Sequence, residues 1–385
     1  MLACCDFYNA LTTHNITFFT GVPDSLLQDV CAYITDHTDS DHHIIAANEG
    51  NAIALAAGYY LSTKQPGLVY MQNSGLGNAV NPLVSLVDPE VYSIPLLMLI
   101  GWRGEPGTRD EPQHVKQGKV TLQLLETLGV PYRVLPEEPV QALLTVQEAV
   151  RGMQQLQSPY ALIVRAGTFQ PYKLQKQIVT SYEMRREDAV QIFADWTRPT
   201  DVVVSTTGKT SRELFEQRER AAKIGQDFLT VGSMGHASQI ALGIALARSD
   251  KEVFCLDGDG AVIMHMGALA IIGCQHVPNF KHIVINNGAH DSVGGQPTAG
   301  FAIDIPSIAR ACGYTHAATA ETREQLLAQL NILRASRGPA LLEVRVNKGA
   351  RPNLGRPTTT PIQNRESFLT FLESRDARVE LPHSQ

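Results

Sequence analysis

The chain has 385 residues, with 32 basic and 38 acidic side chains and a formal net charge of −6 at pH 7. At roughly 100 to 200 residues per domain, this length predicts two domains. A mildly acidic chain with both charges mixed gives no reason to expect a nucleic acid or an anionic membrane as its partner, so any anion that it binds must be held by local chemistry.

The sequence has no features of a membrane or secreted protein. No apolar run reaches the roughly 18 residues that a membrane-spanning helix needs, and the first ten residues, MLACCDFYNA, lack the basic and apolar regions of a secretory signal. The six cysteines include no C-x-x-C pair, which argues against a zinc site or a disulfide framework. We therefore expect a soluble, cytoplasmic protein.

Short apolar runs alternate with helical patterns along the chain. The runs that predict strands are 43–47, 67–72, 95–101, 160–165, 201–205, 252–257, 282–286 and 340–346. The clearest helical patterns between them are 51–63, 261–274 and 323–336. Nearly continuous apolar strands separated by helices are typical of βαβ units, so the pattern predicts an α/β fold with doubly wound parallel sheets.

The sequence contains a weak internal repeat. The segment SPYALIVR at 158–165 is similar to GPALLEVR at 338–345, and Ile-Ala-Leu occurs at both 53–55 and 240–242. The small polar turns Asn-Ser-Gly at 73–75 and Gly-Asp-Gly at 258–260 occur in the same order. The alternative explanation is that α/β domains share Gly- and Ala-rich turns. We interpret the matches as a duplication and expect two similar domains, residues 1–175 and 176–385.

The most specific chemical signal is Leu-Asp-Gly-Asp-Gly at 256–260, followed by a helical stretch and Ile-Asn-Asn-Gly at 285–288. The carboxyl ends of neighbouring parallel strands meet at one sheet edge, so Asp259 and Asn287 are expected to lie together. Both offer oxygen ligands that suit Mg²⁺. Gly258 and Gly260 let the backbone approach a phosphate, and a helix starting near Ala261 directs free N–H groups toward it. These features predict a site for a diphosphate and a divalent metal.

This arrangement resembles the signature of the thiamine-diphosphate-dependent enzymes, and the likeness extends over nearly the whole chain. The resemblance implies that Asp259, the Asn287 side chain and the backbone carbonyl of Ala289 hold Mg²⁺ against the cofactor's diphosphate. It also implies a pyrimidine-binding first domain and a diphosphate-binding second domain with a C-terminal arm. The chain has no room for the central third domain that many members carry.

A glutamate follows the predicted strand at 43–47. Glu49 is flanked by small and apolar residues, so it is expected to be partly desolvated and suited to sharing a proton. The family resemblance implies that Glu49 hydrogen-bonds the cofactor's aminopyrimidine ring. It further implies that Met234 supports the bent cofactor, that the Gly232 carbonyl accepts from the exocyclic amine, and that Asn73 contacts the cofactor. Without the resemblance, Glu49 would be interpreted as a helix N-terminal acid and Met234 as a core residue.

Several longer runs resemble the phosphonopyruvate decarboxylases within this family. These runs are 20–27, 72–78, 103–107, 110–118, 286–297 and 354–361. The resemblance implies non-oxidative decarboxylation of 3-phosphonopyruvate to phosphonoacetaldehyde and CO₂, in phosphonate biosynthesis. The sulfopyruvate decarboxylases, which form sulfoacetaldehyde, resemble the chain as well, and no single residue decides between a phosphonate and a sulfonate. A non-catalytic module that binds thiamine diphosphate is a third alternative, which the presence of Glu49 disfavours.

The polar stretch from 101 to 118 is longer than an ordinary connection and is expected to be a binding loop. It contains cations that could bind an anionic substrate, as does the region 347–361. From motif position, Asp24 and His114 are candidates for proton transfer. The candidate substrate-binding residues are Ser25, Arg103, Arg109, Lys116, Ser292, Arg351 and Arg356. For most of these cations, a solvated surface charge is an adequate alternative.

Two further expectations concern other functions and assembly. The segment Thr-Gly-Lys-Thr-Ser at 207–211 invites a nucleotide-binding interpretation, but a P-loop needs glycine where Val203 stands, so nucleotide hydrolysis is disfavoured. The family resemblance implies that Glu49 of one subunit serves a cofactor that Asp259 of another subunit anchors. A homodimer or a larger homo-oligomer, with active sites between subunits, is therefore expected.

Overall fold

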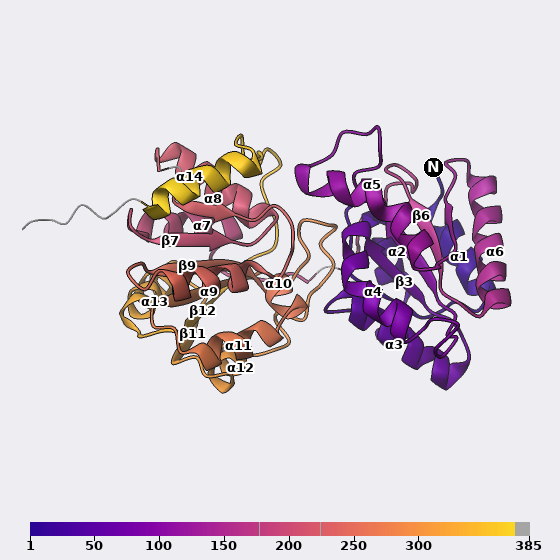
Figure 1. Ribbon diagram of the computed structural model, residues 1–385, viewed down its shortest axis with the longest axis horizontal. Helices are drawn as coiled ribbons and strands as arrows, with labels where there is room; N and C mark the ends of the chain where they lie inside the picture. The colour runs from indigo at the N-terminus through magenta and orange to yellow at the C-terminus, as the bar shows by residue number, and fades with distance from the viewer. Residues whose placement is uncertain (177, 224, 374–385) are drawn as a thin grey trace, which may run out of the picture. The chain divides into compact units, whose positions relative to one another are not determined.

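A computed structural model describes residues 1–176, 178–223 and 225–373 of the chain. The chain divides into two compact units (Figure 1). Unit 1 contains Met1–Ile178 together with Ala289–Thr298, and unit 2 contains Val179–Gly288 and the chain from Ala299 onward. No helix among the described residues is long and apolar enough to cross a membrane, and none of the six cysteines is in a disulfide.

Unit 1 is built on a six-stranded parallel sheet with the order β2-β1-β3-β4-β6-β5. Its strands are β1 (Phe19–Gly21), β2 (His43–Ile45), β3 (Leu68–Gln72), β4 (Leu97–Gly101), β5 (Tyr132–Val134) and β6 (Tyr160–Val164). Its helices are α1 (Cys4–Thr13), α2 (Gln28–His37), α3 (Glu49–Thr63), η1 (Asn73–Gly75, a 3₁₀ turn), α4 (Leu76–Ser85), α5 (Pro112–Thr127) and α6 (Pro139–Leu156).

Unit 2 also has a six-stranded parallel sheet, with the order β11-β12-β10-β9-β7-β8. Its strands are β7 (Val202–Ser205), β8 (Asp227–Leu229), β9 (Val253–Gly258), β10 (Phe280–Asn286), β11 (His316–Ala320) and β12 (Ala340–Arg345). Its helices are α7 (Arg186–Trp196), α8 (Lys209–Arg220), α9 (Ala237–Ala247), α10 (Asp259–Met264), α11 (Gly267–Gln275), α12 (Ile305–Ala311), α13 (Arg323–Ala335) and α14 (Pro361–Glu373).

The two sheets have the same topology. When the strands of each unit are numbered from its own start, both sheets read 2-1-3-4-6-5. The repeated segments occupy equivalent positions: β6 and β12 are the sixth strands, and the turns at 73–75 and 258–260 follow the third strands, β3 and β9. The predicted pair of similar, doubly wound domains is confirmed.

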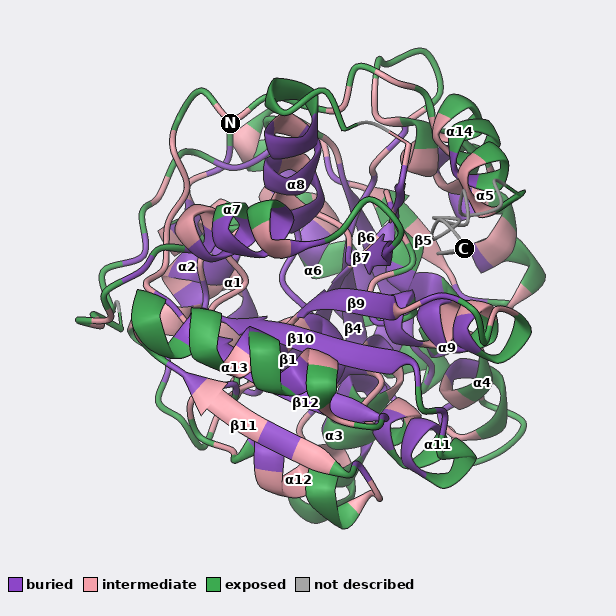
Figure 2. Cartoon of the chain, turned by 90° about the vertical axis from the view of Figure 1, so that its left-hand side faces the viewer, coloured by how far each residue is buried: buried purple, intermediate pink, exposed green. Residues whose placement is uncertain are grey.

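Helices cover both faces of each sheet because alternate strand residues point to opposite sides. In β3, Leu68 and Tyr70 belong to one buried cluster with α1, α2 and α6, whereas Val69 and Met71 belong to another with α3 and α4. Unit 2 has the same two-sided core. Figure 2 shows β9 and β10 almost wholly buried, whereas the covering helix α13 has exposed residues. This leaves the strand ends as the places where polar groups can gather.

The structure differs from the predicted elements in three ways. The sequence analysis missed β1, β5, β8 and β11, of which three have only three residues each. The helix predicted at 261–274 is two helices, α10 and α11, which are separated at His265 and Met266. The predicted loop from 101 to 118 is irregular only as far as 111, because α5 begins at Pro112, where proline is favoured at a first helical position.

Candidate active site

The carboxyl ends of β9 and β10 lie side by side in unit 2. The parallel register pairs Ile285 with Gly258, so α10 and the turn after β10 leave the sheet at the same edge. Asp259 is the first residue of α10 and is 3% exposed, and Asn287 directly follows β10 and is 7% exposed. The structure therefore places these predicted ligands on adjacent strand ends.

A glycine lies against the Asp259 carboxylate. A β-carbon added to Gly300 would lie 2.5 Å from Asp259 Oδ2 and 2.6 Å from Asn286 Oδ1. The Asp259 carboxylate, after β9, and the Asn286 amide, at the end of β10, thus both lie against the Gly300 backbone. Only a residue without a side chain fits there, so the Gly300 backbone packs directly against these two oxygens.

Asn286 fixes the turn that carries Asn287. Its Nδ2 donates to the Gly300 carbonyl at 2.8 Å and to Glu343 Oε1 at 2.7 Å, and its Oδ1 accepts from the Gly288 backbone N–H at 3.1 Å. Glu343 on β12 is fully buried, and its second oxygen accepts from Thr319 Oγ1 at 3.0 Å. The sequence analysis missed Glu343, although a single acid inside an apolar strand was a visible signal.

A cluster of buried polar residues lies in β9 and β10 just before the same strand ends. Asp257 Oδ1 accepts from the Gly258 backbone N–H at 2.9 Å, and Asp257 Oδ2 lies 3.4 Å from His282 Nε2. Cys255 is paired in register with His282 across the two strands, and all three residues are at most 1% exposed. Their ligand atoms lie within 4.8 Å of one another. These contacts hold the end of β9 in place just before Asp259.

The donor set at this edge fits a hard divalent cation and a diphosphate. Asp259 offers a carboxylate and Asn287 an amide oxygen, and Mg²⁺ takes such oxygens together with phosphate oxygens and water. Gly258 and Gly260 bring the backbone close without side chains, and Ala261 adds only a methyl group that is 3% exposed. The residues present therefore suit the group that the sequence predicts.

The segment between β8 and α9 carries Gly232 and Met234. The Met234 side chain is partly buried. The next residue, Gly235, has φ +85°, and a β-carbon there would lie 2.5 Å from His265 Cδ2. Thr207 Oγ1 donates to the Val231 carbonyl at 2.9 Å and holds the start of the segment. The turn that positions Met234 thus requires glycine beside it.

In unit 1, Glu49 lies at the start of α3. Asn48 caps the helix by accepting from the Asn51 backbone N–H at 3.0 Å. Glu49 is 5% exposed, and its Oε2 accepts from Asn78 Nδ2 at 2.7 Å. A β-carbon at Gly75 would lie 2.3 Å from Glu49 Oε1. The carboxyl group is therefore held in one place by α3, the 3₁₀ turn and α4.

Asp24 follows β1 and is completely buried. Gln72 Nε2 donates to its Oδ1 at 2.5 Å, and the Leu26 backbone N–H donates to its Oδ2 at 3.0 Å. Burial raises the pKa of Asp24 above its ordinary value, although the hydrogen bonds from Gln72 and Leu26 and the charge of Arg103 act in the opposite direction. Asp24 can therefore retain a proton at a higher pH than an exposed aspartate.

Arg103 follows β4 and links Ser25, the residue after Asp24, to the loop before α5. Its Nη1 donates to Ser25 Oγ at 2.7 Å, and its Nε donates to Asp110 Oδ2 at 2.8 Å. A third bond joins Arg103 Nη2 to Asp110 Oδ1. Asn73 accepts from the Arg103 backbone N–H at 3.2 Å and donates to the Arg103 carbonyl at 2.8 Å. The structure thus brings four predicted residues together: Asp24, Ser25, Asn73 and Arg103.

Most of the remaining predicted substrate-binding residues are exposed. His114 lies in the first turn of α5 and is partly buried, whereas Arg109 and Lys116 are exposed. Ser292 and Arg356 are also exposed. These positions do not test the roles of the five residues, which stay predictions.

Arg351 lies against two acids of unit 2. Its Nε donates to Glu187 Oε1 at 2.7 Å, and its Nη2 bonds to Glu216. Glu216 also accepts from the Gly355 backbone N–H at 2.7 Å. These bonds attach the segment before α14 to α7 and α8, and they account for the charge of Arg351 within the fold.

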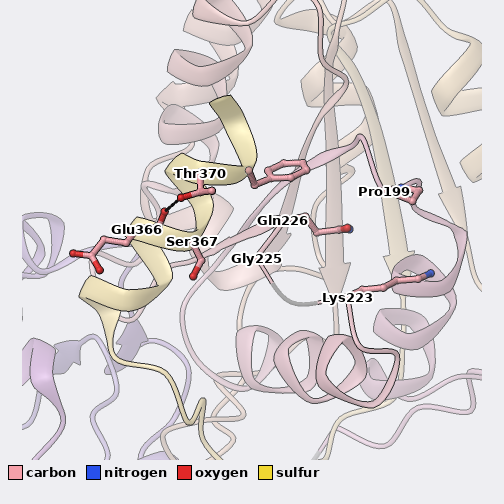
Figure 3. A pocket seen from close by; sticks show the side chains of 8 residues that line it. Pro199, Lys223, Gly225, Gln226, Glu366, Ser367 and Thr370 are labelled. Carbon is pink, nitrogen blue, oxygen red and sulfur yellow. Dashed lines mark hydrogen bonds between the residues drawn. The ribbon is translucent and has the colours of Figure 1, made fainter. Parts of the chain in front are cut away.

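A pocket of about 650 Å³ lies elsewhere in unit 2 (Figure 3). It is lined by Pro199, Lys223, Gly225, Gln226, Glu366, Ser367, Thr370 and Phe371. None of the predicted site residues lines it. The strand-end clusters, rather than this pocket, carry the chemistry that the sequence predicts.

Comparisons with known proteins agree with this geometry. Residues 6–124 match the N-terminal TPP binding domain of thiamine pyrophosphate enzymes, and residues 207–344 match the C-terminal TPP binding domain. The first match covers β1 to β4 of the unit 1 sheet, and the second extends from β8 into β12 of the unit 2 sheet.

Relatives match nearly the whole chain. The phosphonopyruvate decarboxylase of Streptomyces viridochromogenes is 32% identical over 403 residues, which cover 99% of this chain and 98% of that protein. That of Streptomyces hygroscopicus is 33% identical, over 96% of this chain and 94% of that protein. The sulfopyruvate decarboxylase of Methanosarcina acetivorans is 27% identical, over 86% of this chain and 87% of that protein. The chain therefore belongs to the thiamine pyrophosphate enzymes and, within them, to the family of the phosphonopyruvate decarboxylases.

Proposed function

We propose that this chain decarboxylates 3-phosphonopyruvate to phosphonoacetaldehyde and CO₂ with thiamine diphosphate and Mg²⁺. The observation that carries this proposal is the identity of 32–33% to two phosphonopyruvate decarboxylases over nearly their full length. Sulfopyruvate decarboxylation is the second candidate, because a sulfopyruvate decarboxylase aligns at 27% identity over 86% of the chain. The intact Glu49 and Asp259 environments support catalysis rather than binding alone.

In this proposal, residues 1–175 bind the pyrimidine ring and residues 176–385 bind the diphosphate. Asp259, the Asn287 side chain and the Ala289 carbonyl hold Mg²⁺. The other cofactor contacts are Glu49, Asn73, Gly232, Met234, Gly258, Gly260 and Ala261. The position of Asp259 and Asn287, which directly follow the neighbouring strands β9 and β10, supports the metal assignment.

When bound, thiamine diphosphate supplies the electron sink that lets the carboxylate leave as CO₂. The role of the protein is to orient, shield and move protons. Glu49 would hydrogen-bond the pyrimidine ring from a buried position that Asn78 and Gly75 fix. Asp24 and His114 handle the proton that replaces the carboxylate on the substrate carbon.

The substrate's anionic groups are proposed to meet Ser25, Arg103, Arg109, Lys116, Ser292, Arg351 and Arg356. Arg109 and Lys116 are exposed, so their charges are accessible to an anion from solution. Arginine and lysine bind carboxylate and phosphonate through charge-assisted hydrogen bonds. We also infer a homodimer or a larger homo-oligomer in which Glu49 and Asp259 from different subunits act on one cofactor.

The test is a steady-state decarboxylation assay of purified protein on both acids, with and without thiamine diphosphate and MgCl₂. We expect turnover of 3-phosphonopyruvate that requires the cofactor and a divalent metal, with a higher kcat/KM than for sulfopyruvate. A higher kcat/KM for sulfopyruvate would replace the phosphonate assignment. Turnover of neither acid, in protein that binds the cofactor, would support the non-catalytic alternative.

A further inference from the structure

The irregular segment between β4 and α5, residues 102–111, is attached to Asp24 by a continuous chain of hydrogen bonds. The chain runs from Asp110 to Arg103, from Arg103 to Ser25, and from Ser25 Oγ to Asp24 Oδ1 at 3.5 Å. A β-carbon at Gly101 would lie 2.1 Å from Asp24 Oδ2. The end of β4 therefore approaches Asp24 as closely as the backbone allows.

The guanidinium of Arg103 and the carboxylate of Asp110 form a nearly enclosed ion pair. Their side chains are 17% and 13% exposed. Asp110 also accepts from the backbone N–H groups of Gly104 at 2.8 Å and Glu111 at 2.7 Å. Burial alone raises the pKa of Asp110, but the Arg103 hydrogen bonds and these two backbone donors hold it well below its ordinary value. Asp110 is thus a fixed negative charge on the far side of Arg103 from Asp24.

We propose that Arg103 and Asp110 are positioning residues that fix the place of Ser25 and balance the charge beside Asp24, the proton donor of the proposed reaction. This inference rests on the proposed function. In the step concerned, Asp24 gives its carboxyl proton to the substrate carbon that has lost CO₂. The carbon's electron pair forms the new C–H bond, Asp24 becomes a carboxylate, and a proton from water restores it.

The electrostatic surroundings of Asp24 determine the sign of each effect. Arg103 is the cation that acts on it, and Cys31 on α2 is the neighbouring titratable group. Asp110 and Glu111 act on Arg103. Gln72 at the end of β3 and the Leu26 backbone are neutral donors. An uncompensated Arg103 would favour the Asp24 carboxylate, and loss of Arg103 would favour the protonated form.

Opposite shifts of the pH–rate profile test the proposal. Because Asp24 must be protonated, kcat falls as pH rises through its pKa in the enzyme–substrate complex. In Asp110→Asn, we expect this basic limb to move to lower pH by about one unit. In Arg103→Met, we expect it to move to higher pH. The double variant should follow Arg103→Met, because Asp110 acts through Arg103.

A matched control comes from the same segment. Glu105 accepts from Arg165 Nε at 2.7 Å and is joined to Asp24 by none of the bonds described above. Glu105→Gln removes a comparable acid–arginine pair, and we expect its basic limb to stay at the wild-type pH. A shift equal to that of Asp110→Asn would overturn the proposal, because any loosening of the segment would then suffice.

A second readout does not depend on the substrate. The infrared carbonyl band of the protonated Asp24 carboxyl, assigned by its loss in Asp24→Asn, can be titrated in the free protein. We expect its midpoint to move down in Asp110→Asn and up in Arg103→Met. If the midpoints shift but neither acid is decarboxylated, the inference about charge stands and the proposed function fails. An unchanged midpoint in both folded variants would overturn the inference, as would an increase in KM with no change in the pH profile, because Arg103 would then act on the substrate alone and not on Asp24.

Discussion

Asn286 donates from Nδ2 to Glu343 Oε1 at 2.7 Å, between two side chains that are both fully buried. The bond ties β10, which leads to the proposed metal ligand Asn287, to its neighbour β12. Because Asn286 also bonds to Gly300 and Gly288, the geometry of the proposed metal site depends on a residue two strands away from Asp259.

Glu343→Ala is expected to destabilise unit 2 and weaken cofactor binding. The substitution leaves Asn286 Nδ2 with one partner fewer in a buried place, which costs about 1–3 kcal/mol of unfolding free energy. Urea denaturation measures that cost, and calorimetric titration with thiamine diphosphate and Mg²⁺ measures the affinity. Glu148→Ala, at an exposed position of α6, is the control and should change neither. An unchanged affinity of Glu343→Ala for thiamine diphosphate and Mg²⁺ would mean that the Asn286 bonds do not support the metal site.

Gly75→Ala tests the position of Glu49. A β-carbon there would lie 2.3 Å from Glu49 Oε1 and 2.5 Å from its Cδ, so the carboxyl group must move. A displacement of about 1 Å can cost about 100-fold in rate, and we expect a loss of this size in kcat with little change in metal affinity. Gly77→Ala is the matched control, because nothing lies within 4 Å of the added carbon. Equal rates for the two variants would contradict the role assigned to Glu49.

Gly300→Ala tests the proposed metal site in unit 2, the unit that also contains Gly300. The added carbon would lie 2.5 Å from Asp259 Oδ2 and would displace a proposed ligand. Changes next to metal ligands typically weaken affinity by about 10- to 100-fold, and we expect this for Mg²⁺ in a titration that follows cofactor binding. Gly267→Ala on α11 has open space around its added carbon and should retain wild-type affinity. If both variants bind Mg²⁺ alike, the proposed site is misplaced.

Much of the fold could be predicted because buried parallel strands appear in the sequence as apolar runs. The similarity of 158–165 to 338–345 found the sixth strand of both sheets, β6 and β12. The segments β1, β5 and β8 could not be found in this way, because three residues do not establish a period. Their pairing depends on partners distant in the sequence.

The positions of candidate site residues could be predicted where a polar side chain directly follows a strand. Asp259 and Asn287 were identified from their places after β9 and β10. The bonding partners of Arg103 and Arg351 could not be predicted. The sequence does not distinguish an arginine that binds a substrate from one that pairs with an acid inside the protein. Only the fold shows that Asp110 and Glu187 bond to them.

The pH dependence of stability provides a prediction for unit 1 that does not involve the active site. Burial lowers the pKa of His43 from 6.5 to about 4, and the charge of Lys176 adds to this effect. His43 Nε2 lies 2.8 Å from the Tyr70 hydroxyl oxygen. Because its folded-state pKa is depressed, the folded protein binds fewer protons than the unfolded chain between these values. The stability contributed by neutral His43 is therefore present above pH 6.5 and is lost as pH falls toward 4.

The shift corresponds to about 3 kcal/mol of unfolding free energy at most, from 1.36 kcal/mol per pKa unit. In His43→Gln, which keeps a polar group for Tyr70, we expect this part of the pH slope to disappear. Urea denaturation at several pH values between 4 and 7 measures it. His276→Asn, at an exposed helix end with φ 50° that asparagine tolerates, should keep the wild-type slope. The same slope in His43→Gln would mean that another group titrates in this range and that His43 does not control the acid sensitivity of unit 1.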